Sequence, residues 1–198
     1  DYFGGLAAAL ARVPAILTRR VDSPDTPVLG TLKYRAYDRV VAISDVSGAY
    51  HNPGGIDVEA AITHARANRG LLSGYENSPG VRKLDDPAHL LELPVDILAP
   101  AALENQITGK NAARVRARLI AEGANGPITY DADEILNQSG ITIIPDILCN
   151  SGGVTVSYLE WVQNRIGLFW SEDRVNRDLE EIMNRAFDAV YETAQQRE

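Results

Sequence analysis

Short apolar runs alternate with amphipathic segments along most of the chain. The runs are rich in Val, Ile and Leu and are bounded by turn residues, which is typical of buried strands. The segments between them repeat apolar residues every three to four positions, the period of a helix that covers one face. The pattern predicts strands at Val40–Ile43, Val95–Leu98, Arg118–Ala121 and Ile141–Ile144.

The expected helices fill the intervals between these strands. Asp57 is suited to cap a helix that ends near Asn68, and Ser171 is suited to cap the longest helix of the chain. Because strands that alternate with helices imply parallel βαβ units, the sequence predicts an α/β fold with a doubly wound, mostly parallel sheet. The other expected helical segments are 88–93, 111–115, 131–138 and one that starts at Val154.

The C-terminal helix, 171–196, has the clearest helical period, and we expect it to pack one apolar face on the body of the domain. Trp161, Phe169 and Trp170 are expected to anchor the junction that precedes it. Two other stretches lack a regular pattern. We interpret Ser47–Gly55 as a glycine-rich loop and 70–83 as an irregular polar connection.

Residues 1–38 do not follow the alternating pattern. Pro14, Pro24 and Pro27 interrupt any long regular element there. We therefore divide the chain into an irregular N-terminal segment, 1–38, and an α/β domain, 39–198, which includes the C-terminal helices at 171–196. The sequence begins with Asp1 rather than Met, so we expect an incomplete or processed N-terminus.

The amino-acid composition argues against several classes of binding partner and location. The net charge is −8, from 19 basic and 27 acidic residues, which argues against a nucleic-acid-binding surface. No apolar run reaches membrane-spanning length. The single cysteine, Cys149, excludes an intrachain disulfide and suits a reducing compartment, so a cytoplasmic location is expected. The three histidines lack the spacing of metal ligands, and no metal site is predicted.

Residues suited to bind a ligand follow the expected strands. Ligands of open parallel sheets bind outside the carboxyl ends of the strands. Asp45 could accept hydrogen bonds from a ribose hydroxyl and repel a 2′-phosphate, which favours NAD over NADP, and Ser47 could compete for that position. Both are also common turn residues.

The later loops carry asparagines beside small residues. Ala101 and Ala102 leave room for a sugar, and the amides of Asn105, Asn125 and Asn150 can donate and accept hydrogen bonds. Each asparagine could instead stabilise a tight turn.

The loop that ends in Gly152 and Gly153 allows a ligand to approach the backbone closely, or is an ordinary packed turn. Ser157 lies seven residues after Asn150, which corresponds to two helical turns, so both can share one helix face. A serine hydroxyl can also bond back to its own helix.

Three sequence blocks resemble one enzyme family, the glutamate dehydrogenases, in their Rossmann-like nucleotide-binding domain. The resemblance extends from about Arg39 to the C-terminus. Leucine, phenylalanine and valine dehydrogenases share the Asn-x-Gly-Gly-Val core, whereas the continuation Thr-Val-Ser-Tyr-Leu-Glu-Trp looks like the glutamate class. The blocks are Asn150-Ser-Gly-Gly-Val-Thr-Val-Ser-Tyr-Leu-Glu-Trp-Val-Gln-Asn164, Pro100-Ala-Ala-Leu-Glu-Asn-Gln-Ile-Thr108 and Ala121-Glu-Gly-Ala-Asn-Gly-Pro-Ile-Thr129.

This resemblance implies a cofactor, NAD or NADP, and a reaction, the reversible oxidative deamination of L-glutamate to 2-oxoglutarate and ammonium. It implies that Asn125 and Asn150 face the nicotinamide and that Ser157 binds the side-chain carboxylate of the substrate. In the family, a first strand and a Gly-x-Gly-x-x-Gly/Ala phosphate loop should precede Arg39. We expect neither within 1–38, and no Gly-x-Gly occurs anywhere in the sequence. Residues 1–38 are either rearranged relative to the family or are sequence that does not belong to it.

The family's catalytic lysines and aspartate lie on a preceding domain, which nothing in 1–38 resembles. The chain is therefore expected to bind glutamate only with a complementary domain, and to be inactive alone. A homo-oligomer is possible. A non-catalytic nucleotide-binding or regulatory module, and a structural fragment that associates with full-length subunits, remain as alternatives.

Overall fold

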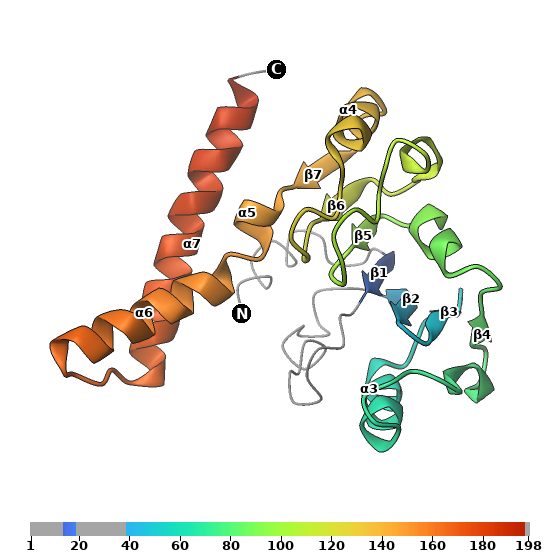
Figure 1. The fold of residues 1–198 in the computed structure, drawn as a ribbon, viewed down its shortest axis with the longest axis horizontal. Coiled ribbons are helices and arrows are strands. Elements are labelled where there is room, and N and C mark those ends of the chain that lie inside the picture. The colour runs from blue at the N-terminus through green and yellow to red at the C-terminus, as the bar shows by residue number, and fades with distance from the viewer. Residues whose placement is uncertain (1–13, 19–38, 197–198) are drawn as a thin grey trace.

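A seven-stranded sheet forms the centre of the chain in a computed structural model, which describes residues 14–18 and 39–196 (Figure 1). The strand order is β4-β3-β2-β1-β5-β6-β7. Neighbouring strands from β2 through β1 to β7 are parallel, whereas β3 and β4 extend the sheet in antiparallel pairs. The predicted α/β fold with a doubly wound, mostly parallel sheet is confirmed. The strands are β1 Pro14–Thr18, β2 Arg39–Asp45, β3 Gly48–His51, β4 Arg82–Lys83, β5 Ile97–Ala99, β6 Leu119–Ala121 and β7 Thr142–Ile144.

The expectation that residues 1–38 contribute no strand is wrong. Pro14–Thr18 forms β1, which pairs with β2 on one side and β5 on the other. A proline is tolerated at the first position of a strand, where the ladder needs no N–H from it. Because the chain order reverses on either side of β1, this strand marks the topological switch point of the sheet. Residues 1–13 and 19–38, on which the phosphate-loop expectation depends, lie outside the described residues.

Two strands also occupy stretches that were expected to be irregular. Gly48, with φ of +148°, closes a two-residue turn at Val46 and Ser47 and starts β3, where a glycine-rich loop was expected. Tyr50 in β3 is fully buried, so this hairpin belongs to the core. β4 lies within the expected polar connection and pairs with β3.

Helices cover both faces of the sheet. Asp57 caps α3 by accepting a hydrogen bond from the N–H of Ala60 at 2.9 Å, as predicted. One core cluster lies under α3 and includes Tyr50 and Tyr75, and the other includes Leu98, Ile120 and Leu136. These helical segments are α3 Val58–Ala67, α4 Tyr130–Gln138 and the 3₁₀ turns η2 Tyr75–Asn77, η3 Pro87–Glu92 and η4 Ala112–Arg114.

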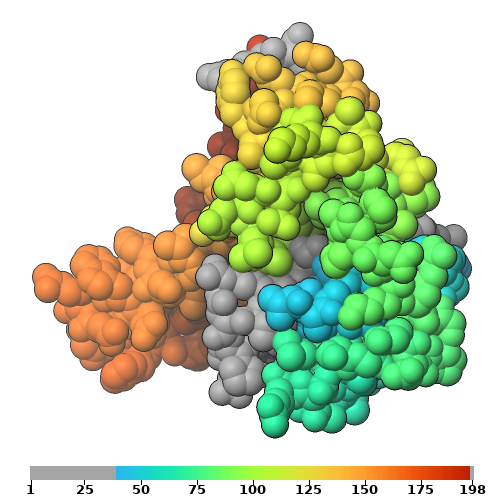
Figure 2. Space-filling view, turned by 45° about the vertical axis from the view of Figure 1, so that its right-hand side comes forward, coloured from blue at the N-terminus to red at the C-terminus, as the bar shows by residue number. Residues whose placement is uncertain are grey.

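The last three helices, α5 Asp146–Cys149, α6 Gly152–Ile166 and α7 Glu172–Gln195, form a C-terminal arm (residues 146–195). Figures 1 and 2 show α6 extending away from the sheet. The predicted helix α7 packs against α5 and α6, and Met183 is its only buried residue. None of the helices in the described residues is long and apolar enough to cross a lipid bilayer.

Aromatic residues at the junction of α6 and α7 only partly follow the prediction. Trp170 is half-buried, and the Arg174 guanidinium lies 4.0 Å from the centre of its ring. Trp161 and Phe169 are 58% and 89% exposed, so their expected anchoring role is wrong. Gly167 ends α6 in a left-handed conformation, and Leu168 and Phe169 in the connection that follows are both exposed.

Candidate functional site

The loops that follow β5, β6 and β7 are hydrogen-bonded to one another at the carboxyl edge of the sheet. The N–H of Ala124, after β6, donates to the carbonyl of Pro100, after β5, at 2.9 Å. The N–H of Asn105 donates to the carbonyl of Gly126 at 2.9 Å. The N–H of Gly126 in turn donates to the Asp146 carboxylate, after β7, at 2.8 Å. The three loops therefore form one connected surface.

Gly123 lets two of these loops approach closely. A Cβ atom at this position would lie 2.8 Å from the Cβ of Ala101 and 3.2 Å from its Cα. Such distances are far below van der Waals contact, so both residues must be small for the loops after β5 and β6 to meet.

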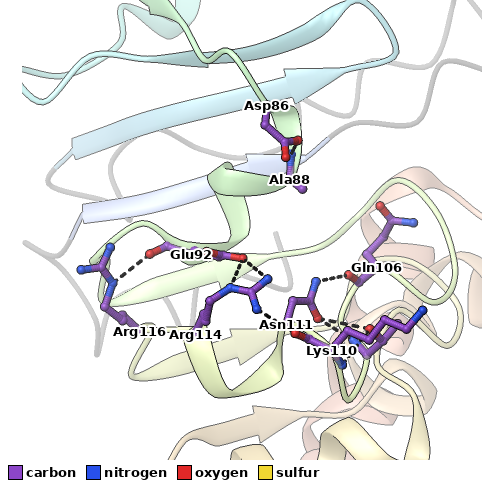
Figure 3. A network of polar contacts seen from close by, with 9 residues as sticks. Asp86, Ala88, Glu92, Gln106, Lys110, Asn111, Arg114 and Arg116 are labelled. Atoms are coloured by element: carbon purple, nitrogen blue, oxygen red, sulfur yellow. Dashed lines mark hydrogen bonds and ion pairs between the residues drawn. The ribbon is translucent and has the colours of Figure 1, made fainter.

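A polar network on η3 and η4 holds the far end of the loop after β5 (Figure 3). Glu92 accepts two bonds of 2.8 Å from the Arg114 guanidinium, and its carbonyl accepts one of 2.9 Å from Arg116. Asn111 donates to the carbonyl of Gln106 at 2.9 Å. These contacts fix residues 106–116, the part of the loop that leads into β6.

Asn125 and Asn150 face each other across the site. The side-chain amide of Asn150 donates to the side-chain oxygen of Asn125 at 2.7 Å. Asn125 is exposed in the loop after β6, and Asn150 is half-buried at the C-terminal end of α5. Two residues expected at one end of a ligand are thus in direct contact, although 25 positions separate them.

Glycines leave open space beside this pair. Cβ atoms built at Gly126, Gly152 and Gly153 would meet no heavy atom of the described residues within 4 Å. Packing against the described residues therefore does not explain the paired glycines at the start of α6. A ligand can reach the backbone there.

Two titratable groups lie beneath the asparagine pair. Glu122 follows β6 and is buried, and burial raises the pKa of its carboxyl. The charges of Asp146 and Asp133 add to this increase, whereas backbone hydrogen bonds at Asp146 and Ile128 oppose it. Burial also raises the pKa of the Cys149 thiol to about 12, reinforced by Glu122 and Asp146. Glu122 was not among the residues predicted from the sequence, although an acidic residue directly after a buried strand was a usable signal.

Cys149 gives a direct test of this environment. Because a thiol reacts as its thiolate, we expect alkylation by iodoacetamide at pH 8 to be at least about a hundredfold slower in the native chain than in guanidinium. The chain has one cysteine, so the total thiol signal reports this residue. Equal rates in the two states would contradict the buried, uncharged thiol.

Asp45 and Ser47 lie at the end of β2, in the turn that leads into β3. One Asp45 oxygen accepts hydrogen bonds from the N–H and the hydroxyl of Ser47, and the other accepts one from the N–H of Leu72 at 2.7 Å. Asp45 therefore has a structural task in tying the segment after α3 to the turn. The side chain of Lys83, in β4, lies against Gly48 at the start of β3.

The remaining predicted residues lie around the connected loops or on α6. Ala101 and Ala102 are half-buried, and Asn105 is exposed with a positive φ of 54°. Ser157 is exposed on α6. Its expected place on one helix face with Asn150 is wrong, because Asn150 ends α5 and α6 begins only at Gly152.

An open parallel sheet with a switch point and connected loops at its carboxyl edge defines this chain as a Rossmann-like α/β domain. The sequence profile of the Glutamate/Leucine/Phenylalanine/Valine dehydrogenase family matches residues 30–198. The chain belongs to this family.

Individual relatives agree with the family match. The chain is 52% identical over 151 residues to NADP-specific glutamate dehydrogenase A1 of Halobacterium salinarum, covering 76% of this chain and 35% of that protein. It is 43% identical over 159 residues to NAD-specific glutamate dehydrogenase of Staphylococcus aureus (strain COL), covering 80% and 37%. The chain thus spans little more than a third of either relative.

A solved structure has a similar fold over nearly the whole chain. The hetero-hexameric glutamate dehydrogenase from Thermus thermophilus, in a leucine-bound form, superposes with a TM-score of 0.79 at 28% identity. The match covers 98% of this chain and 45% of the Thermus chain.

Proposed function

We propose that this chain is the dinucleotide-binding part of a glutamate dehydrogenase that converts L-glutamate to 2-oxoglutarate and ammonium with NAD or NADP. The observation that carries the proposal is the Asn125–Asn150 pair, which lies beside open glycines at the carboxyl edge of the sheet. The names of the Halobacterium and Staphylococcus relatives, NADP-specific and NAD-specific glutamate dehydrogenases, support the same cofactor class.

The chemistry of the pair matches a primary carboxamide. Their mutual bond uses an N–H of Asn150 and the oxygen of Asn125. It leaves the amide N–H groups of Asn125 and the oxygen of Asn150 to face a ligand. The nicotinamide carboxamide carries an acceptor and a donor side by side, which these two groups complement. When bound, the cofactor accepts the hydride, and the task of this chain is to orient the ring that receives it.

The surrounding residues supply the rest of the proposed cofactor site. Ala101, Ala102 and Asn105 border the sugar next to the nicotinamide. Asp45 and Ser47 face the distant ribose, and the Asp45 carboxylate opposes a 2′-phosphate. We therefore propose a preference for NAD over NADP.

Substrate binding requires a second element in this proposal. Ser157 binds the side-chain carboxylate of glutamate from α6, and a complementary domain supplies the groups that bind the α-carboxylate, activate water and move protons. Among the described residues, nine of the twelve exposed large apolar residues lie in the C-terminal arm, which supports docking there. They are Ile147, Val154, Val156, Tyr158, Trp161, Ile166, Leu168, Phe169 and Tyr191. The proposed location is the cytoplasm, and a homo-oligomer is compatible with this surface.

The first test is titration of the purified chain with NADH and NADPH, followed by the fluorescence of the reduced nicotinamide. We expect saturable binding with higher affinity for NADH, and no reduction of NAD with L-glutamate unless the complementary domain is added. Binding without turnover even after that addition would favour a non-catalytic nucleotide-binding module. Absence of binding at millimolar NADH and NADPH would contradict the proposed function and favour a purely structural role.

A further inference from the structure

Glu122 stands apart from the other charged residues of the described part of the chain, because it alone is buried, with 8% of its surface exposed. A buried carboxyl group destabilises a fold unless it has a specific partner, and an apolar residue would be cheaper at such a position. Glu122 lies directly after β6, beneath the loop that carries Asn125. Its contacts explain its presence there.

The Glu122 carboxylate caps the first N–H of α5, whereas the Asp146 side chain binds the second N–H locally. Its Oε2 accepts a hydrogen bond from the N–H of Asp146, the first residue of α5, at 2.8 Å. The first N–H groups of a helix lack partners within the helix. Pro145 precedes α5 and makes no side-chain cap. A residue 24 positions away therefore holds the start of α5.

Helix α5 connects this anchor to the asparagine pair. The Asp146 carboxylate accepts the N–H of Gly126, next to Asn125, at 2.8 Å, and the Asp146 carbonyl accepts the N–H of Asn150 at 3.0 Å. The 2.7 Å bond between Asn125 and Asn150 completes a ring of hydrogen bonds. Any shift of α5 relative to β6 must stretch at least one member of this ring.

We infer that Glu122 is a positioning residue, whose carboxylate holds α5 and thereby keeps Asn125 and Asn150 in register for one ligand. This inference rests on the proposed cofactor site. Glu122 does not touch the ligand in this arrangement and acts through Asp146. The titratable groups that face it are Asp146 and Cys149 of α5 and Asp133 of α4.

Two substitutions by residues similar in size to glutamate distinguish the effect of the hydrogen-bond acceptor from that of the side-chain volume. Glu122→Gln keeps an oxygen that can accept the Asp146 N–H, whereas Glu122→Leu fills the space without an acceptor. We expect NADH affinity to fall about tenfold in Glu122→Leu, because the Asp146 N–H loses its acceptor, and to be retained in Glu122→Gln. Equal affinity in the parent and Glu122→Leu would overturn the inference and leave the proposed function intact.

Amide resonances test the same connection without cofactor. In the parent chain the Asp146 backbone amide should shift as Glu122 ionises, at a pH above the ordinary carboxyl range because burial raises the Glu122 pKa. Glu122→Gln should abolish this shift but preserve the side-chain amide resonances of Asn150, which should move in Glu122→Leu. If the pH dependence of the Asp146 amide is the same in the parent chain and in Glu122→Gln, the inference is overturned. This outcome can be read even if the chain binds no NADH and the proposed function fails. Thermal unfolding of each variant checks that it is folded.

Discussion

Replacement of both Asn125 and Asn150 by alanine is expected to lower NADH affinity by roughly thirtyfold, and each substitution alone by about tenfold. Each amide contributes one side of the proposed carboxamide contact, and each also orients the other through their 2.7 Å bond. Because residues in direct contact interact energetically, the double variant should lose less than the two single losses combined. Fluorescence titration of the four chains at one salt concentration measures this coupling.

Asn137→Ala is the matched control for this series. Asn137 is an exposed asparagine on α4, where its amide bonds to Asp133 within the same helix. Its removal should leave NADH affinity unchanged. An undiminished affinity in the Asn125→Ala, Asn150→Ala chain, with a native circular dichroism spectrum, would show that the pair does not bind the cofactor.

Substitution of Trp161 and Phe169 by serine should strongly weaken docking of a complementary domain without destabilising the chain. Both residues are exposed, so the free energy of unfolding should change by less than about 0.5 kcal/mol for each. Exposed aromatic residues often dominate an interface, and their joint loss should weaken association by more than about 2 kcal/mol. Calorimetric titration with the part of the Staphylococcus aureus relative that this chain does not match measures the effect.

Tyr130→Ser separates this docking effect from a general loss of apolar surface. Tyr130 is 82% exposed at the start of α4, in a different region from the C-terminal arm (Figure 1). Its substitution should not change the association. If the serine variants of Trp161 and Phe169 associate as well as the parent chain, the complementary domain docks elsewhere.

Local sequence signals predicted the parallel half of the sheet and its helices. The β-branched runs and the cap at Asp57 act over a few residues, and no distant contact overrides them. β1 was missed because its short apolar run starts at a proline in a proline-interrupted segment. β3 was missed because glycines were interpreted as a loop, although Gly48 supplies the positive φ that closes a hairpin.

The meeting of the candidate loops at one edge of the sheet was predictable, but their internal contacts were not. The rule that ligands bind at the carboxyl ends of parallel strands selects the loops of Asn125 and Asn150 from the sequence alone. Their hydrogen bond and the capping of α5 by Glu122 join residues more than twenty positions apart. Such contacts depend on how the strands are placed side by side, which no local pattern encodes.

The short strand β4 limits how a strand from another molecule can add to one edge of the described sheet. It ends one side of the sheet with only two residues, Arg82 and Lys83, and both are exposed. Brief, positively charged border strands oppose the addition of a strand from another molecule. Strands from other molecules are therefore hindered from extending the sheet at β4. The exposed apolar surface of the C-terminal arm can then persist without leading to β-sheet aggregation at this edge.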